Sequence, residues 1–255
     1  MKRRGILTAG VAVLATGAVA WWQRNDIVRA FTTRPKDKMP QLTDAIVPAA
    51  DVCPLTPEQV EGPFFISAPT RRDIREDRTG VNLELALQIV ANDGCTPVQG
   101  AVVEVWHCDA AGRYSGYRED LTRHPFDTML SIGSPDAHVA PANGKRYLRG
   151  AQTSDARGMV AFQTILPGWY EPRATHIHVK VFQGEQSYLT TQLYFPEELV
   201  QQIYSSHPDY APHGCCPYNH LNDIVLAETQ TGAGLLLRPQ QTASGLTAAC
   251  RFALA

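Results

Sequence analysis

The alternation of apolar and polar residues in residues 81–90, VNLELALQIV, is the feature that most constrains the fold of this chain. Side chains two positions apart share one face of a β-strand. The apolar face of this segment carries Leu83, Leu85, Leu87 and Ile89. The opposite face carries Glu84 and Gln88. The pattern predicts a strand with one face in a hydrophobic core.

Later segments are also short, apolar and bounded by Gly or Pro. Strands are predicted within residues 100–114 and 153–168, and at 175–182, 188–195, 232–239 and 246–255. Pro196 is expected to begin a short helix that runs through Tyr204. Many short strands with almost no helix indicate an all-β sandwich of mixed or antiparallel strands with long loops. The longest such loop falls in residues 115–150.

The first 20 residues, MKRRGILTAGVAVLATGAVA, have the form of an export signal. A positive start precedes an apolar stretch, and Ala18-Val19-Ala20 matches a signal-peptidase site. The Arg3-Arg4 pair suggests the twin-arginine route, and an uncleaved membrane anchor is the alternative. We therefore expect a signal peptide at 1–20, a linker or wrapping arm at 21–50 and one folded domain at 51–255. The expected location is periplasmic or extracellular.

Charge and cysteine content restrict the expected binding partners and the expected disulfides. The formal net charge is −2, no basic face stands out, and a nucleic-acid partner is not expected. An even number of cysteines in an exported chain suggests disulfides, with the adjacent Cys215-Cys216 pair bonded to distant partners. The six cysteines are Cys53, Cys95, Cys108, Cys215, Cys216 and Cys250. All six are interpreted as structural, although the sequence does not select a pairing.

The segment LPGWYEPRATHIHV, residues 166–179, carries the candidate chemistry. On a strand, His176 and His178 project to one side, with Ile177 and Val179 on the core side. Two imidazoles side by side form half of a metal site. The alternative is a pair of ordinary surface or network histidines.

Two tyrosines stand where predicted strands meet loops. Tyr114 follows a Gly-Arg turn, and Tyr170 follows the turn at Pro167-Gly168. A phenol ionises only near pH 10, so a strongly Lewis-acidic ion such as ferric iron is needed to bind it as phenolate at neutral pH. A tyrosine at the sandwich edge with a satisfied hydroxyl is the structural alternative.

Several segments in order resemble the intradiol ring-cleavage dioxygenases, the family of protocatechuate 3,4-dioxygenase and catechol 1,2-dioxygenase. The resemblance spans roughly residues 50–255. Its segments are LTPEQVEGPFF (55–65), GAVVEVWHCDAAGRYSGY (100–117), QTSDARGMVAFQTILPGWY (152–170), RATHIHVKV (173–181) and TTQLYF (190–195).

The resemblance implies one non-haem Fe(III) per chain, held by Tyr114, Tyr170, His176 and His178. It further implies cleavage of a catechol-type ring between its hydroxylated carbons with O2, giving a muconate-type dicarboxylic acid. Tyr170 resembles the ligand that substrate displaces, and is expected to serve also as a base.

Two further residues occupy positions of the family motifs. Arg173 is expected to stabilise negative charge on the substrate ring, with pairing to Glu171 or a carbonyl group as the alternative. Gln192, in TTQLYF, is expected to form a hydrogen bond near the iron, or to be only a polar strand residue. His107 is interpreted as a buried network histidine. The expected loop histidines are His124, His138, His207, His213 and His220.

The chain also departs from the family. We expect no counterpart in it of the large helical N-terminal region of catechol 1,2-dioxygenases, and no segment of the loop at 115–150 identifies the substrate. The candidate substrates are protocatechuate, catechol, hydroxyquinol and larger lignin-derived catechols. The sequence does not choose among them, and it does not fix the oligomeric state. A non-catalytic β-sandwich binding module of the same fold is the main alternative function. A zinc or copper enzyme with a His-x-His pair is a third.

Overall fold

A computed structural model describes residues 53–123, 138–227, 229 and 235–255. The predicted signal peptide at 1–20 and the linker at 21–50 lie outside these residues, as does His124. Within the described ranges, no helix has both the length and the hydropathy needed to cross a membrane.

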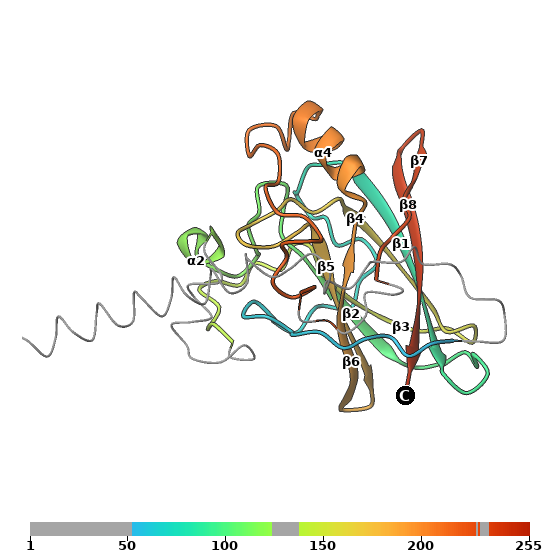
Figure 1. The fold of residues 1–255 in the computed structure, drawn as a ribbon. Coiled ribbons are helices and arrows are strands. Elements are labelled where there is room, and N and C mark those ends of the chain that lie inside the picture. The colour runs from blue at the N-terminus through green and yellow to red at the C-terminus, as the bar shows by residue number, and fades with distance from the viewer. Residues whose placement is uncertain (1–52, 124–137, 228, 230–234) are drawn as a thin grey trace, which may run out of the picture. The chain divides into compact units, whose positions relative to one another are not determined.

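The described strands form two four-stranded sheets, which confirms the expected all-β class (Figure 1). The first sheet consists of β4 (Met159–Ile165), β1 (Asn82–Ala91), β8 (Gly245–Leu254) and β7 (Gln240–Thr242), in that order. The second consists of β3 (Arg149–Thr153), β2 (Val102–Trp106), β5 (His176–Gln183) and β6 (Gln186–Tyr194). Strands β1 and β8 pair in parallel, and the other pairs are antiparallel.

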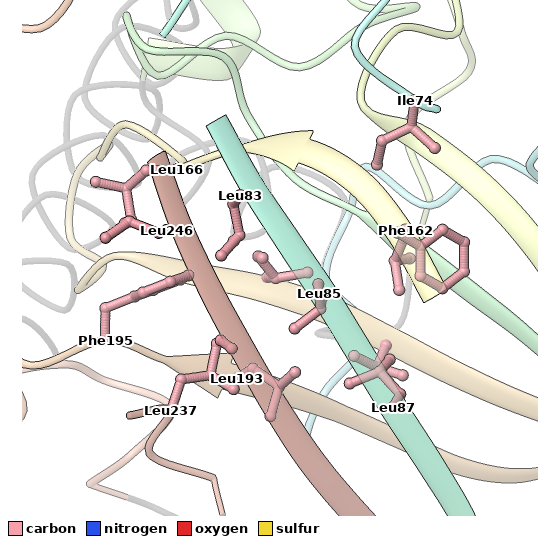
Figure 2. Packing of buried hydrophobic residues seen from close by; sticks show 14 of the residues in the cluster. Ile74, Leu83, Leu85, Leu87, Phe162, Leu166, Leu193, Phe195, Leu237 and Leu246 are labelled. Atoms are coloured by element: carbon pink, nitrogen blue, oxygen red, sulfur yellow. The ribbon is translucent and has the colours of Figure 1, made fainter. Parts of the chain in front are cut away.

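The main hydrophobic core contains the apolar faces of both sheets. Leu83, Leu85 and Leu87 follow one another along β1, each at most 1% exposed, as the alternation predicts (Figure 2). Ile177 and Val179 of β5 belong to the same buried cluster. Burying apolar surface stabilises by about 25 cal/mol per Å², so this core is the main favourable contribution to folding.

Two short helices occur among the described residues: α2 (Glu119–Arg123) and α4 (Glu197–Ser206). Helix α4 follows Pro196, as predicted, and carries Glu197 and Glu198 in its first turn. Negative charges at this end of a helix interact favourably with the helix dipole and stabilise the helix. Val200, Ile203 and Tyr204 turn inward and are buried. The helix packs against the core at one end of the strands (Figure 1).

The predicted strand at 232–239 is wrong for the described part of that segment. Residues 235–239 form only an isolated bridge, between Leu236 and Tyr194, and β7 begins at Gln240. Leu235 and Leu237 are buried by packing against other side chains and not through a sheet ladder. A short apolar run does not distinguish these two kinds of burial.

The expectation of several disulfides is also wrong. One bond joins Cys53 and Cys95, whereas Cys108, Cys215 and Cys216 carry free thiols. The predicted bonds from the adjacent pair to distant partners do not form. Cys108 is buried among aromatic residues and Cys216 in the main core, while Cys215 is exposed. A disulfide requires closely approaching Cβ atoms, and residue spacing does not reveal which thiols meet this condition.

Candidate metal centre

The two candidate histidines lie on β5, between β2 and β6 in the second sheet. His178 is opposite Trp106 of β2 and Gln192 of β6, and His176 is opposite Tyr194. Both imidazoles lie on the face away from Ile177 and Val179, yet they are only 2% and 3% exposed. This strand is therefore buried on both faces.

The two loops that carry the tyrosines fit together through glycines. At Gly112, where φ is +78°, a Cβ atom would lie 2.2 Å from the carbonyl oxygen of Trp169. At Gly168, a Cβ atom would lie 2.5 Å from the carbonyl oxygen of Ala110. Any larger residue would separate the loops, so both glycines are needed to bring Tyr114 and Tyr170 together.

Four donor atoms from these elements form a closed ring. The hydroxyl oxygens of Tyr114 and Tyr170 are 3.1 Å apart, and that of Tyr170 is 2.8 Å from Nε2 of His176. Nε2 of His176 is 3.1 Å from Nε2 of His178, which is 3.1 Å from the hydroxyl oxygen of Tyr114. The structure thus brings together all four residues that the family resemblance suggested as ligands.

These four contacts contain too few protons to be four hydrogen bonds. Nδ1 of His176 lies 2.6 Å from the carbonyl oxygen of Ala174, so Nδ1 carries the proton and Nε2 keeps a lone pair. Each phenol supplies one proton, and neutral His178 supplies at most one. At least one contact therefore joins two lone pairs, and a cation among the donors would relieve that repulsion.

The spacing and type of the donors also fit a metal ion. Donors about 3 Å apart around a ring match ligands that share one ion at bond lengths of about 2 Å. Within the described ranges, His, Cys, Asp and Glu side chains alone form no group of three or more that could hold a metal. The two tyrosine oxygens are thus needed to complete a four-donor set.

Burial keeps the four groups neutral when no cation is present. It raises the pKa of the Tyr114 and Tyr170 phenols above their usual value. It lowers the pKa of the His176 and His178 imidazoles, and the charge of Arg173 adds to this effect. Neutral imidazoles are the form that binds metals, and a strongly Lewis-acidic ion would be required to ionise the phenols.

Arg173 lies beside this ring and is held by a buried carboxylate. Its Nε is 2.9 Å from Oδ2 of Asp223, a residue that is fully buried. Burial by itself lowers the pKa of Arg173, but Asp223, Tyr194 and Tyr170 together outweigh burial and raise it. The sequence suggested Glu171 as the carboxylate partner, and no local pattern in YNHLND singled out Asp223.

Gln192 connects Arg173 to the chain segment that precedes the first strand. Its Oε1 accepts a hydrogen bond from Nη2 of Arg173 at 2.5 Å, and its Nε2 donates to the carbonyl oxygen of Val60 at 3.0 Å. The hydroxyl group of Tyr194 also contacts this oxygen, at 3.2 Å. Gln192 thus orients Arg173 and fixes Val60 against β6.

A small pocket opens beside the donor ring. Tyr170, His178 and Arg173 line one part of it. The rest of the lining consists of Val60, Gly62, Pro63, Phe64, Pro172, Ile224 and Val225. The ring of Phe64 packs 5.0 Å from that of Tyr114, measured between centroids. The pocket thus has a donor phenol, a donor imidazole and the arginine in its wall.

Two buried residues that support the donor ring were not singled out by sequence. Trp106 stacks on the imidazole of His178, with the ring centroids 4.7 Å apart. The guanidinium of Arg149 lies 5.8 Å from the centroid of Tyr114 and bonds to Ser115. Burial lowers the pKa of Arg149 to about 10. Their roles depend on strand register, which pairs both residues across β2 and β3.

The remaining histidines lie where the sequence suggested. His107 is buried, bonded to Thr164 and to the carbonyl oxygen of Cys108, and burial lowers its pKa to about 4. It is a network residue, as expected. The four described loop histidines are His138, His207, His213 and His220, and each lies outside the strands and helices.

Comparison with known proteins identifies the family. The sequence model of a family described as dioxygenase matches residues 59–209, more than half of the chain. An intradiol ring-cleavage dioxygenase from Tetranychus urticae superimposes with a TM-score of 0.68 and 28% identity, over 79% of this chain and 94% of that one. This chain belongs to the intradiol ring-cleavage dioxygenase family. The resemblance suggested by the motifs is therefore confirmed.

Curated relatives match over shorter regions. The protocatechuate 3,4-dioxygenase beta chain of Burkholderia cepacia is 35% identical over 116 residues, which cover 42% of each chain. The catechol 1,2-dioxygenase of Pseudomonas sp. (strain EST1001) is 27% identical over 179 residues, covering 65% of this chain and 56% of that protein. The chain thus spans about half the length of these curated relatives.

Proposed function

We propose that this protein is a non-haem Fe(III) intradiol dioxygenase. It would cleave a catechol-type ring between the two hydroxylated carbons with O2 and release a muconate-type dicarboxylic acid. The closed ring of four tyrosine and histidine donors is the observation that carries this proposal. The N-terminal sequence supports export of the enzyme, which stays a prediction.

Tyr114, Tyr170, His176 and His178 are the residues that would hold one iron per chain. A bound ferric ion would supply the Lewis acidity that holds both substrate oxygens and makes the ring reactive toward O2. The proton shortage in the donor ring favours a cation at this position.

Tyr170 is suited to act as a base. Its hydroxyl belongs to the donor ring, and its side chain also lines the adjacent pocket. It is therefore within reach of a substrate hydroxyl group that enters from the pocket. We infer that its phenolate accepts a substrate proton, which would leave the substrate as the more strongly binding anion.

Arg173 would stabilise negative charge on the bound ring, because its guanidinium lines the same pocket. Asp223 and Gln192 fix its orientation before substrate enters, so little reorganisation is needed during the reaction. Phe64 and Pro63 line another part of the pocket, and both are buried.

Oxygen uptake and product analysis test the proposal directly. Iron-loaded full-length protein is expected to consume one O2 per catechol and to place both atoms of labelled O2 in the diacid. His178→Ala should abolish uptake, while the loop variant His207→Ala retains it. Catechol binding without oxygen uptake would favour a non-catalytic binding module. A semialdehyde product would show that cleavage falls outside the diol.

A further inference from the structure

Arg149, the first residue of β3, is a fully buried arginine that holds the loop carrying Tyr114. Its Nε donates a hydrogen bond to Oγ of Ser115 at 2.8 Å, and its Nη2 donates one to the carbonyl oxygen of Ser115 at 3.1 Å. Because Ser115 directly follows Tyr114, these two bonds fix the backbone beside a member of the donor ring.

The positive charge of Arg149 has no carboxylate to balance it within the described part of the chain. An arginine keeps its charge at neutral pH. Among the described residues, no Asp or Glu side chain forms an ion pair with Arg149, and its Nη1 atom has no hydrogen-bond partner. A buried charge without a counter-charge is costly. A negative group close to this guanidinium would therefore be strongly stabilised.

Two tyrosine rings flank the guanidinium. Its central carbon lies 5.8 Å from the ring centroids of both Tyr114 and Tyr117. The hydroxyl group of Tyr117 donates a hydrogen bond to the carbonyl oxygen of Phe65, so this phenol keeps its proton. The oxygen of Tyr114 instead belongs to the donor ring. Tyr114 is thus the neighbour of Arg149 that a bound cation would convert to a phenolate.

We propose that Arg149 is a positioning residue whose fixed charge balances the phenolate of Tyr114 in the iron-loaded protein and so retains Tyr114 as a ligand. This inference rests on the proposed function. Opposite charges about 6 Å apart in a protein interior attract strongly enough that removal of one should weaken retention of ferric iron by about 10-fold or more, measured by competition with a chelator.

The visible spectrum of the ferric-loaded full chain tests the inference without relying on activity. A positive charge near a phenolate lowers the energy of its electrons, so its loss should move the phenolate-to-iron band to longer wavelength. Arg149→Met removes the charge and keeps an unbranched side chain. The matched control is Arg157→Met, because Arg157 is 80% exposed, and it should leave both the band and iron retention unchanged. An unmoved band in folded Arg149→Met would overturn the inference.

A second background shows which tyrosine responds. In Tyr170→Phe, Tyr114 is the remaining candidate phenolate of the donor ring. Adding Arg149→Met to this variant should give the same shift to longer wavelength. A shift that occurs only when Tyr170 is present would overturn the inference, because the charge would then act on the other tyrosine.

Three further variants separate charge from packing. Ser115→Ala removes one bond to Arg149 but keeps the charge, so the band should not move. Arg149→Gln is neutral yet polar and should reproduce the shift, whereas Arg149→Lys keeps the charge and should not. These two variants also provide the comparison if Arg149→Met does not fold. The same band position in Arg149→Lys and Arg149→Gln would overturn the inference, since charge would then not be the cause.

The outcomes separate the two levels of the account. A normal band and oxygen uptake in the unaltered protein, with no response to the loss of charge at Arg149, would overturn this inference and leave the proposed function intact. An unaltered protein that shows no band after ferric loading would overturn the proposed function and this inference with it.

Discussion

Strands β1 and β5 are both central in their sheets, yet their outer faces differ. On β1, the residues between the buried leucines are partly exposed, as in an ordinary two-layer sandwich. On β5, His176 and His178 are as deeply buried as Ile177 and Val179 on the core side. The first sheet therefore covers only a core, whereas the second has a further buried layer over its outer face.

That further layer is built from irregular segments. Residues 60–64, the loop around Gly112 and the loop around Gly168 contribute to it. It encloses imidazoles, phenols and arginines, which gain little from burial as such and bring a desolvation cost. The hydrophobic core between the sheets, the core layer, stabilises the fold. The outer layer over β5 holds polar groups in an arrangement that suits a metal ion and an aromatic substrate.

Tyr114→Phe is expected to have the largest effect, because it removes one donor oxygen and keeps the aromatic packing against Phe64. Iron content should fall sharply, and catechol-dependent oxygen uptake by about 1000-fold or more. The unfolding midpoint of the iron-free protein should change little. The control Tyr188→Phe alters an exposed ring and should leave all three quantities unchanged. Full activity in Tyr114→Phe would show that this oxygen is not a ligand.

Asp223→Asn tests the buried ion pair of the outer layer. It leaves Arg173 buried without its carboxylate, and loss of one member of such a pair costs about 3–5 kcal/mol of unfolding free energy. Urea denaturation of the iron-free protein measures this change. The double variant Arg173→Met/Asp223→Asn should recover part of the stability but not the activity. Equal stability of Asp223→Asn and the unaltered protein would mean that the pair is not needed for the fold.

Leu85→Ala tests the core layer on β1. The cavity should lower the unfolding free energy by about 2–5 kcal/mol. Iron content per folded chain and kcat should stay unchanged, because Leu85 lies in the main core and the donor ring lies on the outer face of the other sheet. Loss of iron binding at temperatures where this variant is still folded would contradict the separation of the two layers.

The sequence predicted the core layer more completely than the outer one. Alternation on β1 placed its leucines correctly, because a period of two depends only on local backbone geometry. The same rule put His176 and His178 on one face. That these histidines meet Tyr114 and Tyr170 came from family resemblance, since contacts between loops leave no periodic pattern.

Long-range partners were the part that sequence reasoning missed. Asp223 meets Arg173 across a separation of 50 residues, and an acidic residue in a polar loop has no distinguishing signal. The disulfides were overestimated for a similar reason, since thiol count does not report distance. The segment 235–239 has apolar side chains buried in clusters without a strand ladder, which composition does not separate from a strand.

The most direct test of the account is the visible absorption spectrum of the ferric-loaded protein, with iron measured on the same sample. A phenolate bound to Fe(III) absorbs strongly in the visible range, so we expect about one iron per chain and a red-brown colour. The band should shift when catechol binds without O2, and it should be weakened in Tyr114→Phe but not in Tyr188→Phe. A folded protein that stays colourless after ferric loading would contradict the central claim that these four side chains form an iron site.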